Sequence, residues 1–169
     1  MTKRKRRGIL IAAAVVLLAV VAGTVACFPR TFAQAVGGSY DPAKTPRENG
    51  LQELHVFLSG VTADETRELH LAPDDPAVAE VTALLDSQSW RPAYPTGARQ
   101  IGMDYMVMAS YVMVGDGQEG GIPAARVLLD GSRIAQAGVG ADLKDYRMDP
   151  ALQQEILDVL LEQPYTPVS

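Results

Sequence analysis

A run of twenty-one uncharged residues, Gly8 to Phe28, follows directly after five consecutive basic residues, Lys3 to Arg7. A helix of this length measures roughly 30 Å, which is enough to cross the apolar part of a bilayer. Because a basic flank stays on the cytoplasmic side, the rest of the chain is expected outside the cytoplasm. The sequence therefore predicts residues 1–28 as a basic flank followed by a transmembrane anchor or signal segment.

Three fates of this segment are compatible with the sequence. It can remain as a single-pass anchor in the cell membrane with the C-terminal domain outside. It can be removed after Ala35, where Ala33-Gln34-Ala35 has the small-x-small pattern of a signal-peptidase site, and the domain would then be secreted. It can also be cut before Cys27, since Thr24-Val25-Ala26-Cys27 resembles a lipoprotein cleavage box in which the cysteine receives the lipid.

The charge of the later residues excludes some partners. From Val36 onward the chain has nine basic and twenty acidic residues, a net charge of −11. Such a charge argues against binding to nucleic acid or to an anionic membrane surface. The only cysteine, Cys27, lies in the leader, so the later residues have no disulfide, no cysteine-based zinc site and no thiol nucleophile.

Glycine and proline separate the leader from a domain. Residues 29–50 contain Gly37-Gly38-Ser39, Pro42, Pro46 and Gly50 without an apolar period, which predicts a flexible linker. Residues 51–169 are then predicted as one extracytoplasmic domain.

Apolar periods and helix-start signals define the elements of this domain. Alternation of apolar and polar residues predicts strands, and Asp-Pro pairs at Asp75-Pro76 and Asp149-Pro150 predict helix starts. Asp130-Gly131 is typical of a two-residue hairpin turn. The expected strands cover 51–58, 68–72, 101–114, 125–129, 132–137 and a short stretch at 144–148, with helices over 76–87 and from 150 to about 163.

This order of elements predicts an α+β fold. The sheet is expected to be antiparallel, with about five or six strands and two helices packed on one face. One N-terminal transmembrane or signal helix would precede it.

Two histidines form the first candidate site. If Leu54 pairs with Leu71 in the first hairpin, the same register places His55 opposite His70. Opposed side chains have Cβ atoms about 4.5–5.5 Å apart, which is close enough to share a metal ion. Glu53 and Glu68 lie on the same face as possible further ligands. The alternative is that both histidines are ordinary solvent-facing strand residues.

The segment Trp90-Arg91-Pro92-Ala93-Tyr94 forms the second candidate site. Trp90, Arg91 and Tyr94 are of the types that protein interfaces favour, which suggests a ligand- or partner-binding surface. The alternative is that Trp90 folds back onto the core below the preceding helix.

Methionine spacing suggests a third site. Met103, Met106, Met108 and Met113 could present thioether ligands to Cu(I). The alternative is that Met106 and Met108, on one face of a strand, simply fill space in the core.

The stretch from Leu69 through Leu85 to Arg91, with the letters SWRPAY, resembles small uncharacterised exported proteins of Gram-positive bacteria. The resemblance is one of pattern, covers roughly Leu51 to Gln163 and includes no diagnostic motif. It implies an extracytoplasmic domain with an N-terminal anchor or lipid attachment, and it assigns no catalytic residue.

The sequence lacks the standard catalytic and cofactor-binding signatures, including the P-loop and the G-x-S-x-G elbow. A non-catalytic domain without a cofactor is therefore expected, tethered to the membrane or secreted, that binds a protein or cell-envelope partner. The alternatives are a carboxylate-dependent hydrolase of envelope polymers, with two acidic side chains in a cleft, or a protein that handles copper or zinc.

Overall fold

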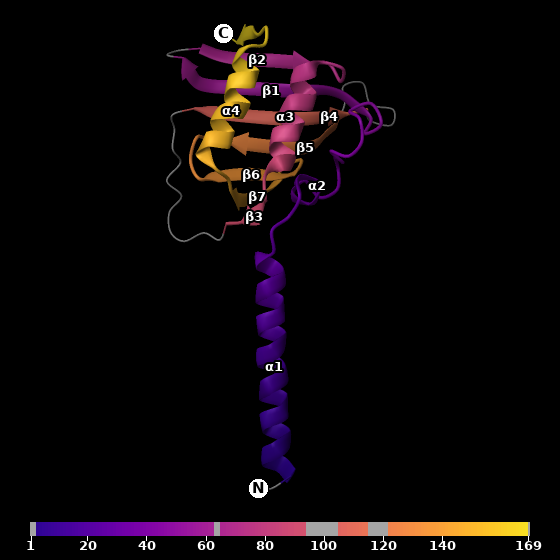
Figure 1. Cartoon of the computed structure of the whole chain (residues 1–169), viewed down its shortest axis with the longest axis vertical. Helices are drawn as coiled ribbons and strands as arrows, with labels where there is room; N and C mark the ends of the chain where they lie inside the picture. The colour runs from indigo at the N-terminus through magenta and orange to yellow at the C-terminus, as the bar shows by residue number, and fades with distance from the viewer. Residues whose placement is uncertain (1–2, 63–64, 94–104, 115–121, 169) are drawn as a thin grey trace.

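The computed structural model describes residues 3–62, 65–93, 105–114 and 122–168. Helix α1 (Lys3–Cys27) extends as a separate rod from a folded domain that contains all the other elements (Figure 1). Within the described ranges, no helix is both long enough and apolar enough to cross a membrane.

Eight strands form one antiparallel sheet in the part of the chain that the structure describes, which is more than the five or six expected. Their order across the sheet is β3-β7-β6-β5-β4-β1-β2-β8. The edge strands β3 and β8, of two and three residues, were not predicted. The strands are β1 (Leu51–Thr62), β2 (Glu65–Leu71), β3 (Arg91–Pro92), β4 (Met106–Met113), β5 (Ile122–Leu129), β6 (Ile134–Val139), β7 (Asp142–Arg147) and β8 (Thr166–Val168).

Parts of two predicted elements lie outside the described residues. The strand expected from residue 101 is described from residue 105 onward, and β4 begins at Met106. The glycine-rich turn expected at residues 115–121 is also outside the described ranges.

Two helices, α3 (Pro76–Ser87) and α4 (Pro150–Leu161), cover one face of the sheet, as predicted (Figure 1). Each begins with the same cap. The carboxylate of Asp75 accepts the Ala77 N–H at 2.9 Å, and that of Asp149 accepts the Ala151 N–H at 3.0 Å. These caps, with proline at the first helical position, fix where both helices start.

The hairpin predicted around Asp130-Gly131 is present, although its connection is longer than two residues because β5 ends at Leu129 and β6 begins at Ile134. Gly131 has a φ of +74°, which favours glycine. Gln153 of α4, fully buried, accepts the Gly131 N–H at 3.0 Å and donates to the Ser132 carbonyl at 2.6 Å. A buried amide therefore ties this turn to α4.

Residues 29–50, expected to form a flexible linker, instead pack onto the domain. The segment contains the short helix α2 (Phe32–Ala35), and Phe32 and Tyr40 are almost fully buried. Phe32 lies 5.7 Å from Trp90 and 5.8 Å from Tyr111 between ring centroids. Phe32 and Tyr40 thus complete the core although no periodic pattern surrounds them, because their aromatic partners come from distant parts of the chain.

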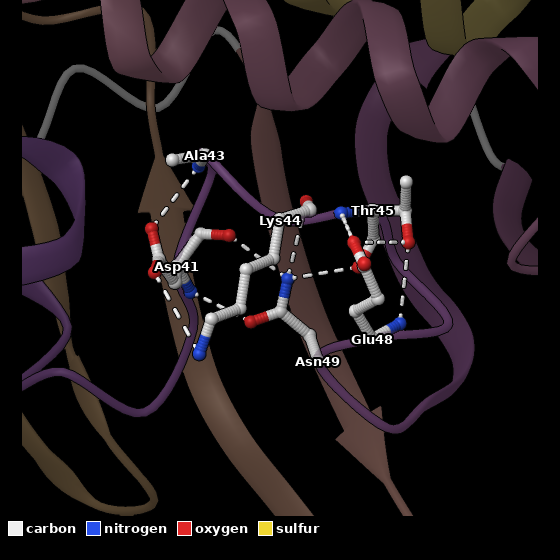
Figure 2. Close-up of polar contacts among 6 residues, drawn as sticks. All are labelled: Asp41, Ala43, Lys44, Thr45, Glu48 and Asn49. Atoms are coloured by element: carbon white, nitrogen blue, oxygen red, sulfur yellow. Dashed lines mark hydrogen bonds and ion pairs between the residues drawn. The ribbon is translucent and has the colours of Figure 1, made fainter.

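Asn49 holds the second half of this segment in place (Figure 2). Its Oδ1 accepts the Asp41 N–H at 2.8 Å, and its Nδ2 donates to the carbonyls of Asp41, Lys44 and Thr45 at 2.8, 3.3 and 3.1 Å. Glu48 Oε2 accepts both the N–H and the hydroxyl of Thr45 at 2.8 Å. Side chains replace the backbone hydrogen bonds that a regular element would supply.

Candidate metal site on the open face of the sheet

The register of the β1–β2 hairpin positions the candidate site. Leu54 pairs with Leu71, Val56 with Leu69 and His55 with His70, which confirms the predicted register. The four apolar residues are nearly or fully buried on the face that the helices cover. Since side chains alternate along a strand, the two histidines point to the other face.

Two glutamates on the same face complete a cluster with the histidines. His55 Nε2 lies 2.6 Å from Glu68 Oε1, and His70 Nε2 lies 3.6 Å from the same oxygen. The two imidazole rings are stacked, with centroids 4.6 Å apart and planes 10° apart. One ligand atom from each of His55, Glu68 and His70 lies within 4.8 Å of the other two.

Glu53 has a different role from Glu68. Its Oε2 lies 3.2 Å from His70 Nδ1, on the side of the ring away from Glu68. A carboxylate at one ring nitrogen fixes the tautomer and leaves the other nitrogen as a ligand. The sequence does not distinguish the two glutamates, but in the structure Oε1 of Glu68 approaches both imidazole rings, whereas Oε2 of Glu53 approaches the ring of His70 from its Nδ1 side.

One distance in the cluster matches a transition-metal site, whereas the stacked imidazole rings would have to turn before each could direct a nitrogen at the same ion, because a bound ion lies in the plane of the ring. Bond lengths of about 2.0–2.2 Å in a tetrahedral zinc site place neighbouring ligand atoms roughly 3.4 Å apart. The 3.6 Å between His70 Nε2 and Glu68 Oε1 is close to this value. The 2.6 Å between His55 Nε2 and Glu68 Oε1 is a hydrogen-bond distance that would lengthen when an ion replaces the proton.

The surroundings favour a cation with one open coordination position. The carboxylates of Glu53 and Glu68 bring negative charge to the cluster, which attracts a divalent ion. The side chains of His55, Glu68 and His70 are 29 %, 32 % and 51 % exposed, so the site is open to solvent. Three protein ligands leave a fourth position for water or an external group.

The structure describes two of the three residues of the surface predicted around Trp90, namely Trp90 and Arg91. Trp90 is fully buried, its Nε1 donates to the Leu85 carbonyl at 2.9 Å, and its ring meets Tyr146 edge-on at 5.5 Å. This agrees with the alternative that Trp90 folds back onto the core, because the indole satisfies its one donor there. Arg91 is exposed on β3, and Tyr94 lies outside the described residues.

The three described methionines of β4 are divided between the two faces of the strand. Met106, 37 % exposed, and Met108 lie on the open face of β4, whereas Met113 packs against the core. Met108 pairs with Phe57 and Leu128 on the neighbouring strands. Met103 lies outside the described residues.

No pattern in the sequence indicates Arg133 and Arg147, which join Arg91 around a cavity at the opposite edge of the sheet. The two-residue strand β3 brings Arg91 beside Arg147, and so short a strand has no detectable period.

Comparison with family models, with curated proteins and with solved structures gave no match to this chain.

Proposed function

We propose that this chain is a membrane-tethered domain that lies outside the cytoplasm and binds a divalent transition-metal ion through His55, Glu68 and His70. The observation that carries the proposal is the convergence of these three ligand atoms within 4.8 Å, with Glu53 orienting His70. Two imidazoles and one carboxylate are a ligand set that zinc accepts in proteins. Zinc is therefore the first ion to test.

Two features support α1 as the membrane tether: the uncharged sequence of the leader and the exposure of its apolar side chains. The uncharged run extends from Gly8 to Phe28 in the sequence. The large apolar side chains described on α1 are exposed, with Ile11 at 65 % and Leu18 at 68 %. Exposed apolar side chains along a helix are accounted for by a lipid environment.

The packing of residues 29–50 favours retention of the leader over cleavage after Ala35. Phe32 and Ala35 are both in the core, and cleavage at that position would remove them from it. Attachment of a lipid at Cys27, which is exposed, would leave the whole packed segment in place. The anchor and the lipid attachment are therefore the two fates that support an intact domain.

Cell fractionation tests the tether. We expect the protein in the membrane fraction, with the sheet domain digested when protease is added to intact spheroplasts. The intact mass of the purified protein then distinguishes an uncleaved leader from lipid attachment at Cys27. Full-length protein in the cytosolic fraction would contradict the proposal.

Calorimetric titration with zinc tests the metal site. We expect one ion per chain for the wild type and a large loss of affinity for Glu68→Gln. Glu80→Gln is a matched control, since it removes the same charge from an exposed position on α3. Equal affinities for the wild type and Glu68→Gln would exclude this cluster as the binding site.

A protein or envelope partner fits the same proposal. The open coordination position faces the side of the sheet that the helices leave uncovered, so an oxygen or nitrogen of a partner could fill it. The hydrolase alternative requires two acidic side chains in one cleft. Among the described lining residues of two cavities, of about 660 and 580 Å³, there is one carboxylate each, Asp149 and Asp86.

A further inference from the structure

A cavity of about 660 Å³ opens at the edge of the sheet formed by β3 and β7, on the far side of the sheet from the β1–β2 hairpin. Three arginines line it. Arg91 is on β3, Arg147 is on β7, and Arg133 is in the connection before β6. Three of the nine basic residues from Val36 onward thus meet at one cavity in an acidic domain.

Within the described ranges, the guanidinium groups of these three arginines have no carboxylate paired with them. Arg91 lies directly opposite Arg147 in the β3–β7 pair, an arrangement that like charges make unfavourable. Among the residues that the structure describes, none of the three arginines forms an ion pair. An anion bound between them would remove the repulsion.

The one carboxylate among the described lining residues is already engaged. Asp149 Oδ1 accepts the Ala151 N–H at 3.0 Å and caps α4. On the opposite wall, Gln88 Nε2 donates to the Arg147 carbonyl at 3.3 Å, and the Met148 N–H donates to the Arg133 carbonyl at 3.1 Å. These bonds hold the backbone of Arg147 and Arg133 and do not involve their guanidinium groups.

The cavity lies on the side of the domain next to α1. Figure 1 shows β3 and β7 at the edge of the sheet nearest that helix. Arg91 also lines a smaller pocket together with Thr24, Cys27 and Phe28, at the C-terminal end of α1. A helix that ends at this level in a membrane would place Arg91 among the lipid headgroups.

We propose that Arg91, Arg133 and Arg147 bind the phosphate group of an anionic phospholipid in the leaflet where α1 ends. Guanidinium groups match phosphate oxygens in charge and in hydrogen-bond geometry. The net charge of −11 argues against a general attraction to an anionic surface, but this edge of the domain has the opposite sign locally. Bound lipid would fix the domain against the membrane and direct the β1–β2 hairpin away from it.

The lipid assignment depends on the proposed placement of α1 in a membrane, whereas binding of phosphate as such does not. The first experiment therefore uses the full chain in uncharged maltoside micelles, titrated with inorganic phosphate and followed by the arginine Nε–Hε resonances. We expect the resonances of Arg91, Arg133 and Arg147 to shift together. Sodium chloride at equal ionic strength should not reproduce the shifts.

Variants make this titration specific. Replacing the three arginines together (Arg91→Gln, Arg133→Gln, Arg147→Gln) should weaken phosphate binding by about tenfold or more. The matched control replaces Lys44, Arg47 and Lys144, each with an exposed side chain and an ion pair elsewhere, and changes the net charge equally. Equal affinities of the two triple variants would overturn the proposed site.

The second experiment identifies the source of the phosphate. The full chain is placed in nanodiscs of phosphatidylcholine alone or with phosphatidylglycerol, without added phosphate. We expect the three arginine resonances to shift only when phosphatidylglycerol is present. Shifts with inorganic phosphate but not with phosphatidylglycerol would overturn the lipid assignment, and failure of the chain to enter either disc would overturn the placement of α1 while leaving the micelle titration valid.

Discussion

The two faces of the β1–β2 hairpin differ in character, although the residues that form them alternate along the same two strands. On the inward face, Leu54 and Leu69 are buried beneath the helices at 0 % and 1 % exposure. On the outward face, the side chains of His55 and His70 are 29 % and 51 % exposed. The inward face therefore supplies free energy of folding, and the outward face presents side chains that can bind.

This contrast shows how a site can be positioned by residues that do not belong to it. A slip of one residue in the pairing would move the leucines to solvent and the histidines into the core. The hydrophobic face therefore holds His55 opposite His70. Substitutions on the two faces should separate stability from metal binding.

The largest effect is expected for a phenylalanine on the helix-covered side. Phe32→Ala should lower the free energy of unfolding by about 3–5 kcal/mol, because a fully buried ring is removed from an aromatic cluster. Phe57→Ala, on the open face, is the matched control and should cost much less. Chemical denaturation of both variants would measure this, and equal losses would contradict the inclusion of residues 29–50 in the core.

Neighbouring positions on β1 provide the sharpest test of the contrast. Leu54→Ala should lower the free energy of unfolding by about 2–5 kcal/mol without changing the ligands of the metal. His55→Ala should change stability little and weaken zinc binding by about a hundredfold or more, since a direct ligand is lost. Chemical denaturation of both variants would measure stability, and calorimetry would measure zinc affinity. A loss of zinc affinity in Leu54→Ala together with a loss of stability in His55→Ala would contradict the assignment of the two faces.

A smaller effect is expected at the orienting carboxylate. Glu53→Gln keeps the size of the side chain but removes the charge beside His70 Nδ1, which should weaken zinc binding by about tenfold. A loss as large as that of Glu68→Gln would mean that Glu53 is itself a ligand.

The smallest effect is expected for Glu48, a carboxylate that contributes to the pH dependence of stability and does not belong to the proposed metal site. Hydrogen bonds from the Thr45 backbone N–H and hydroxyl lower the pKa of Glu48. A carboxyl group whose pKa is lowered by folding adds stability above its unfolded pKa, and this is lost as the pH falls through the folded value. The free energy of unfolding should therefore fall slightly less below about pH 4 in Glu48→Gln than in the wild type. The zinc affinity of this variant should be unchanged. Acid titrations followed by circular dichroism would detect this, and a changed zinc affinity would contradict it.

The elements that the sequence predicted correctly are those with local, repeated information. The alternation from Leu54 onward and the leucines of β2 were enough to predict the hairpin and its register, because burial of one face admits only one pairing. The Asp-Pro pairs before α3 and α4 predicted both helix starts for an equally local reason.

What could not be predicted depends on partners far away in the chain. Phe32 and Tyr40 have no periodic neighbours, and their burial follows from packing against Trp90 and Tyr111. The strand β3 exists because the chain after α3 reaches β7, so the opposition of Arg91 and Arg147 is a tertiary result. For the proposed metal site the sequence predicted the histidine pair, and only the side-chain geometry distinguished the contacts of Glu53 from those of Glu68.

The most direct test of the metal site is a zinc titration followed by the imidazole nitrogen resonances of the two histidines. The proposed site predicts that the Nε2 resonances of His55 and His70 shift together and are complete at one equivalent, while His70 Nδ1 keeps its proton toward Glu53. Resonances that do not change through the titration would show that the cluster is only an ion-pair network on the surface of a sheet.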